Sequence, residues 1–129
     1  MATKKILAIV ESAYRATLEE QDDPVIWLAH ALRGAGSDID VLLTGHAVNY
    51  GVKAQDAGGL VFGEKRQTQP PRLAQDLASL ARKGARVLYV EEDARALGIG
   101  DHEVIDEVKA VASRSLPGLL EEYGQVWRW

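Results

Sequence analysis

The most informative absence in this 129-residue sequence is cysteine, of which it has none. The chain therefore forms no disulfide, thiolate metal site or iron–sulfur cluster, and it carries no thiol chemistry. Glycine is missing from the stretch that follows the first apolar run, ESAYRATLEEQDD. Dinucleotide-binding and P-loop motifs need glycine there so that backbone amides can approach a phosphate. We therefore expect neither a bound dinucleotide nor a P-loop NTPase.

Long apolar runs and a basic excess are missing as well. The apolar runs fall far short of the roughly 20 residues that a membrane helix needs, and the N-terminal run lacks the length and cleavage site of a signal peptide. Fifteen Lys and Arg against nineteen Asp and Glu give a net charge of −4, whereas nucleic-acid-binding surfaces are basic. No HExxH or HxH spacing indicates a metal site. We expect a cytoplasmic protein without cofactor or metal that binds neither membrane nor nucleic acid.

The apolar stretches that are present predict a parallel sheet. A chain of 129 residues with 47% hydrophobic positions suits one domain, residues 1–129. Continuous apolar runs indicate strands covered on both faces. The expected strands are Ile6–Val10, Ile39–Leu43, Val87–Val90, a weaker 109–113 and an alternating edge strand at 125–129. With helices between them, this order predicts an α/β fold: a three-layer α/β/α sandwich around a mostly parallel sheet of about five strands.

Helix boundaries are marked by proline, glycine and acidic cap candidates. One helix is expected to begin at Asp22-Asp23-Pro24 and to stop at the glycines 34 and 36, because proline is tolerated in a first helical turn and glycine favours a helix end. Prolines 70 and 71 open a second helix that ends before Gly84. Shorter helices are expected at 93–97 and 115–123.

Residues that follow the strands are the candidates for chemistry, because ligands of open α/β sheets bind beyond the carboxyl ends of the strands. This rule selects residues 11–15, 44–46, 91–93 and 113–115. Among them Asp93, with Glu91 and Glu92 beside it, is the candidate catalytic or binding acid. Asp93 also precedes a predicted short helix and is more simply explained as its cap.

The segment from 44 to 69 is too long for an ordinary connection and indicates function or an interface. We expect a short helix at 47–55 and a flexible loop or small hairpin at 57–63. The candidate ligand-binding residues near this segment are Tyr14, Arg15, His46, Asn49 and Arg66. They can line a polar pocket or fill a subunit interface, and we favour the interface because aromatic residues and arginine are enriched there.

Four strings in the sequence resemble the DsrE/DsrF-like family of small sulfur-relay proteins: KKILAIV, DIDVLLTGHAV, GARVLYVEEDARALGI and KAVASRSLPGLLEEYGQVWRW. The resemblance implies a three-layer α/β fold with a five-stranded sheet, assembled as homo- or hetero-oligomers, often trimers or hexamers. It also implies that active members carry sulfur as a persulfide on a cysteine just after the third strand, in a block resembling CxxCLxxRGI.

That block falls on 90–99 of this sequence, and the position matching the sulfur-carrying cysteine is Asp93. A carboxylate forms no persulfide. Our first hypothesis is therefore a homo-oligomeric binding or regulatory protein without sulfur transfer. A second is the non-thiol subunit of a hetero-oligomer with a related DsrE-like subunit. A third is an enzyme that uses Asp93 or Glu91 as acid or base, with His46 or Tyr14 assisting and Arg15 holding an anionic substrate.

Overall fold

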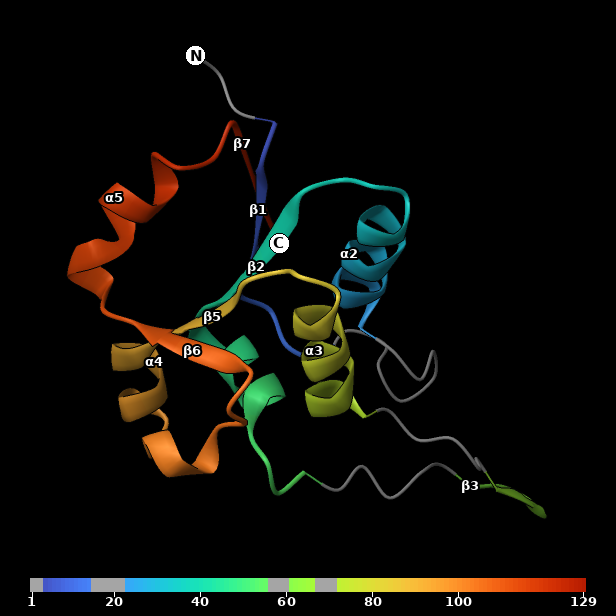
Figure 1. Cartoon of the computed structure of the whole chain (residues 1–129). Coiled ribbons are helices and arrows are strands. Elements are labelled where there is room, and N and C mark those ends of the chain that lie inside the picture. The colour runs from blue at the N-terminus through green and yellow to red at the C-terminus, as the bar shows by residue number, and fades with distance from the viewer. Residues whose placement is uncertain (1–3, 15–22, 56–60, 67–71) are drawn as a thin grey trace.

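A five-stranded parallel sheet forms the centre of the computed structural model, which describes residues 4–14, 23–55, 61–66 and 72–129 (Figure 1). Its strands are β1 (Ile6–Val10), β2 (Ile39–Leu43), β5 (Val87–Val90), β6 (Val108–Val111) and β7 (Gln125–Arg128). Their order is β6-β5-β2-β1-β7, and every neighbouring pair is parallel. The five predicted strands are confirmed, although β6 covers 108–111 rather than 109–113.

Helices cover both faces of this sheet, which confirms the predicted α/β/α sandwich. On one face lie α2 (Pro24–Gly34) and α3 (Leu73–Arg82), and on the other lies α5 (Leu116–Leu120) (Figure 1). Helix α4 (Glu91–Ala96) follows β5 directly and packs beside the 3₁₀ helix η1 (Gly45–Gly51). Two further 3₁₀ turns are η2 (Asp101–Glu103) and η3 (Ser113–Ser115).

Alternation along the strands divides the core into two unequal layers. Ile39, Val41 and Leu43 of β2 join the larger layer beneath α2 and α3, whereas Leu42 joins the smaller layer beneath α5. Successive strand residues point to opposite faces, so a continuous apolar run supplies both layers. Because α5 has only five residues, the second face is thinly covered: Ile9 is half-buried and Val126 is 44% exposed.

The middle of the chain differs in part from the prediction. In place of a helix at 47–55 the structure has η1 at 45–51, because Tyr50 turns into the core and is fully buried. Of the predicted loop or small hairpin at 57–63, residues 57–60 lie outside the described residues, and 61–63 belong to a hairpin of β3 (Val61–Phe62) and β4 (Lys65–Arg66). Prolines 70 and 71 lie outside the described residues, and α3 begins at Leu73. The predicted helix at 115–123 is shorter, ending at Leu120.

Tyr50 connects three segments that meet at the start of α2. As predicted, Asp23 caps this helix: its Oδ1 accepts hydrogen bonds from the amides of Val25 (2.8 Å) and Ile26 (3.2 Å). Tyr50 donates its hydroxyl hydrogen to Asp23 Oδ2 at 2.6 Å and accepts a hydrogen bond from the amide of Tyr14. The buried carboxylate of Asp23 is thus fully hydrogen-bonded, as a buried charge requires.

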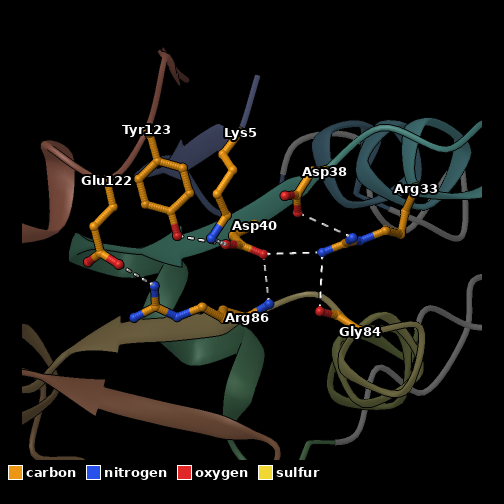
Figure 2. Close-up of polar contacts among 8 residues, drawn as sticks. All are labelled: Lys5, Arg33, Asp38, Asp40, Gly84, Arg86, Glu122 and Tyr123. Carbon is orange, nitrogen blue, oxygen red and sulfur yellow. Dashed lines mark hydrogen bonds and ion pairs between the residues drawn. The ribbon is translucent and has the colours of Figure 1, made fainter. Parts of the chain in front are cut away.

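Asp40, a buried acid inside β2, organises the amino edge of the sheet (Figure 2). Its Oδ1 accepts hydrogen bonds from the amide of Arg86 (2.8 Å) and from Nη2 of Arg33 (3.3 Å). Its Oδ2 accepts one from the Tyr123 hydroxyl (2.6 Å) and lies 3.9 Å from Nζ of Lys5. One carboxylate therefore joins the starts of three neighbouring strands to α2 on one face and to the segment after α5 on the other.

The first prediction is that Asp40→Asn lowers the free energy of unfolding by about 3 kcal/mol, because it leaves two partly buried cations and the buried Tyr123 hydroxyl without their anion. Asp38→Asn is the matched control, since Asp38 pairs with the same Arg33 at 3.4 Å but is half exposed. We expect it to cost about 1 kcal/mol or less. Urea unfolding followed by circular dichroism measures both, and equal effects of the two changes would contradict the role assigned to Asp40.

The second prediction concerns alkaline pH. Burial, and then a hydrogen bond to an aspartate, raises the pKa of Tyr50 and of Tyr123 above the ordinary value of 10.0. The folded chain therefore keeps both tyrosines protonated, and this stabilises the folded state. The stabilisation is complete below the pKa of tyrosine in the unfolded chain and is lost as the pH rises through the pKa in the folded chain. Above about pH 10 each tyrosine lowers the free energy of unfolding by up to about 1.4 kcal/mol per pH unit.

Urea unfolding of the wild type and of a Tyr50→Phe/Tyr123→Phe double variant, each from pH 8 to pH 11.5, measures this slope. The double variant starts from a lower stability at pH 8 because two hydrogen bonds are lost, but its stability then declines less steeply. Parallel curves for the two proteins would show that these tyrosines do not govern the alkaline loss.

Candidate functional site

An open cleft of about 350 Å³ lies at the carboxyl edge of the sheet, on the face that α5 covers. Its floor is apolar and comes from two neighbouring strands and one helix: Ile9, Leu42, Leu116 and Leu120. Ile9 and Leu42 are paired in the β1–β2 register, and Leu116 and Leu120 are one helical turn apart on α5. The cleft exists because the short helix α5 leaves the ends of β1 and β7 uncovered.

Five residues that carry polar groups surround this floor: Glu11, Thr44, Gly45, Asp93 and Arg128. Nη2 of Arg128 lies 2.7 Å from Oε2 of Glu11, so these two charges neutralise each other. Asp93 Oδ2 accepts a hydrogen bond from the amide of Gly45 at 2.8 Å. Asp93 makes no ion pair with any residue that the structure describes. One carboxylate thus sets the net charge of the cleft.

Asp93 reaches the cleft because α4 begins at the residue after β5, with no connecting loop. The predicted role of Asp93 as a helix cap is wrong: Val90 is the cap residue, and Asp93 is the third residue of α4. Its partner Gly45 has a positive φ of 52°, a conformation that glycine adopts without strain. A Cβ there would lie 3.4 Å from Cγ of Glu11, so glycine also fits the crowded rim.

The other two acids of the predicted cluster point elsewhere. Glu91 pairs with Arg95 one turn along α4, at 2.8 Å. Glu92 accepts hydrogen bonds from the amide of Ser113 (2.9 Å) and from its hydroxyl (2.7 Å), and these hydrogen bonds lower the pKa of Glu92. Neither residue lines the cleft. Glu92 therefore ties α4 to η3, Glu91 forms an ion pair within α4, and Asp93 alone of the three lines the cleft.

The predicted ligand-binding residues Tyr14, His46, Asn49 and Arg66 do not line this cleft. Tyr14 is 53% exposed and packs edge-on against Tyr50, with ring centroids 5.3 Å apart. His46 is exposed, and Asn49 donates its side-chain amide to the carbonyl of His46 at 2.8 Å. Arg66 is exposed on the β3–β4 hairpin, and Arg15 lies outside the described residues. A binding role for these five residues stays a prediction, and the proposed pairing of Asp93 with His46 or Tyr14 is not formed in the cleft.

Sequence reasoning missed the apolar floor and Arg128. The strand pattern contained a usable signal, since Ile9 and Arg128 are register partners on β1 and β7 and point to the same face. The pairing of β7 with β1 is what a single sequence does not reveal, because their residues are far apart along the chain.

The described residues contain neither a metal-ligating cluster nor a helix that could cross a membrane. No group of three or more His, Asp or Glu side chains in those residues can hold a metal ion. No helix in the described part of the chain is both long enough and apolar enough to cross a membrane.

Comparison with known proteins identifies similar structures but no sequence relatives. No family model matches the chain, and no curated protein matches it. The crystal structure of the YchN protein from E. coli is similar over 98% of this chain and 100% of its own, with a TM-score of 0.74 and 20% identity. Two further similar structures are described as proteins of unknown function. MTH1491 from Methanobacterium thermoautotrophicum has a TM-score of 0.64 and 14% identity, and the match covers 98% of this chain and 100% of that one. BT1422 from Bacteroides thetaiotaomicron has a TM-score of 0.67 and 11% identity, and the match covers 98% of this chain and 95% of that one.

At these identities the similarity shows the fold alone. The chain shares the α/β sandwich of the YchN structure. What such a fold does is decided by the residues of its site.

Proposed function

We propose that this chain is a DsrE-like binding protein without sulfur transfer, which associates with itself and holds a small ligand in the cleft beside Asp93. The observation that carries the proposal is that the Asp93 carboxylate lines a cleft at the carboxyl edge of the sheet. By the resemblance described above, this is the position of the sulfur-carrying cysteine in active members of the family.

The chemistry of the cleft supports binding rather than sulfur transfer. A carboxylate accepts hydrogen bonds and pairs with cations, but it forms no persulfide, and the whole chain has no thiol. A volume of about 350 Å³ lies within the range of small-molecule sites, which are mostly apolar with a few polar groups that fix orientation. The cleft of this protein has that composition.

Self-association is supported by the β3–β4 hairpin. Figure 1 shows β3 standing away from the sheet, and Val61 is 64% exposed. A two-stranded hairpin is marginally stable without a surface to pack on. Lys65 and Arg66, against Glu64 in the turn, give the hairpin a net charge of +1, whereas the chain as a whole has a net charge of −4. A second copy of this chain therefore offers a complementary surface, and we propose a trimer or hexamer, as in the family that the sequence resembles.

The third prediction tests the ligand. Leu120→Trp fills the cleft floor with a larger side chain, whereas Leu97→Trp is its matched control on an exposed leucine outside the cleft. Each protein is incubated with a protein-free small-molecule extract of cells, desalted and denatured, and the released compounds are measured by mass spectrometry. We expect at least one compound to be retained by the wild type and by Leu97→Trp but lost from Leu120→Trp. If the wild type retains nothing, or all three retain the same compounds, the cleft is not the binding site.

The fourth prediction tests the assembly. Light scattering after gel filtration should give the wild type three or six times the chain mass of 14.1 kDa. Val61→Glu places a charge in the hairpin interface and is expected to give a single chain. Val126→Glu is the matched control, since Val126 is also an exposed strand valine, and it should keep the wild-type mass. A monomeric wild type would refute self-association. Dissociation by Val126→Glu but not by Val61→Glu would show that the interface lies at β7 and not at the hairpin.

A further inference from the structure

The electrostatics of the cleft restrict the charge of its ligand. Arg128 is the cationic side chain of the lining, and it is engaged by Glu11 at 2.7 Å. Asp93 uses one oxygen, Oδ2, to accept the Gly45 amide. Its other oxygen has no hydrogen-bond partner among the residues that the structure describes. The cleft therefore presents one carboxylate that is not neutralised, which attracts a cation and repels an anion.

The apolar residues that line the cleft restrict the uncharged part of the ligand. Beside Asp93, the floor offers aliphatic side chains from both sides: Ile9 and Leu42 from the sheet, and Leu116 and Leu120 from α5. Leu116 and Leu120 are only partly buried, so apolar surface there is still open to water. An apolar ligand group between the sheet and α5 would remove that surface from water, which is favourable. The carboxylate of Asp93 thus lines the same cleft as an aliphatic floor.

We propose that the ligand of this cleft is a small organic cation: an ammonium group that pairs with Asp93, attached to an apolar body that lies on the leucines of α5. The ammonium has three N–H donors and no acceptor, which matches a carboxylate with a free oxygen. The Arg128–Glu11 pair closes the rim without changing its charge. This inference rests on the proposed binding function and names the class of ligand.

The test uses three probes with the same six-carbon body. n-Hexylammonium is cationic, 1-hexanol is neutral and hexanoate is anionic, and their affinities are measured by ligand-observed NMR titration at one pH and ionic strength. We expect n-hexylammonium to bind the wild type at least tenfold more tightly than hexanol, and hexanoate to bind more weakly than either.

Two variants with the same change in charge distinguish the effect of the Asp93 carboxylate from the effect of the net charge of the protein. Asp93→Asn keeps an oxygen that can accept the Gly45 amide but removes the charge, and it should weaken n-hexylammonium binding about tenfold while leaving hexanol unchanged. Asp106→Asn is the control, because Asp106 is an exposed acid that does not line the cleft. It should leave all three affinities unchanged.

The probes distinguish failure of this inference from failure of the binding function. Three results would contradict the proposed cationic ligand, although the cleft would still bind a ligand. They are equal affinities for the three probes, a preference for hexanoate, and equal effects of Asp93→Asn and Asp106→Asn. Absence of binding by n-hexylammonium would also overturn it, and the extract experiment with Leu120→Trp then reports separately on the cleft. Because the probes are compared first in the wild type, the result does not depend on the stability of a variant.

Discussion

A single buried carboxylate, that of Asp40, sets the geometry on which the rest of this fold depends. It is 2% exposed and is shared by groups from the segment before β1, the end of α2, the start of β5 and the segment after α5. A buried charge is tolerated only when its hydrogen-bonding capacity is filled. Each of these segments must therefore reach the amino edge in the correct position, and this fixes where the strands leave the opposite edge.

The aspartates at the two edges of the sheet have opposite environments. Asp40 has partners for both oxygens and serves stability, whereas Asp93 at the carboxyl edge has one oxygen engaged by a backbone amide and lines an open cleft. This contrast agrees with the general rule that open α/β sheets bind ligands at their carboxyl edge. The thin cover of α5 adds the apolar half of the site, since a longer helix would fill the space above Ile9 and Leu42. The carboxylate of Asp93 and the apolar floor therefore lie in the same cleft.

Much of the fold could be predicted from the sequence, because burial on both faces leaves a plain signal. Strands such as Ile39–Leu43 read as apolar runs, and the Asp23–Pro24 start of α2 follows from the physics of helix ends. Asp40 inside the same apolar run gave no such signal, since its partners lie on segments that only the folded chain brings together. The position of Asp93 at a strand exit was predictable, but its role was not: the absence of a loop between β5 and α4 makes it a helix residue and turns Glu91 and Glu92 away.

The pairing of β7 with β1 has a consequence for how the cleft comes into being. Glu11 and Arg128 lie 117 positions apart along the chain, and β7 follows every other strand. Contacts between distant residues form slowly, because a long stretch of chain must be closed into a loop before they contribute. The Glu11–Arg128 side of the rim therefore forms later than contacts between strands that are close in sequence, such as β1 and β2, whereas the floor and Asp93 come from segments that precede β7.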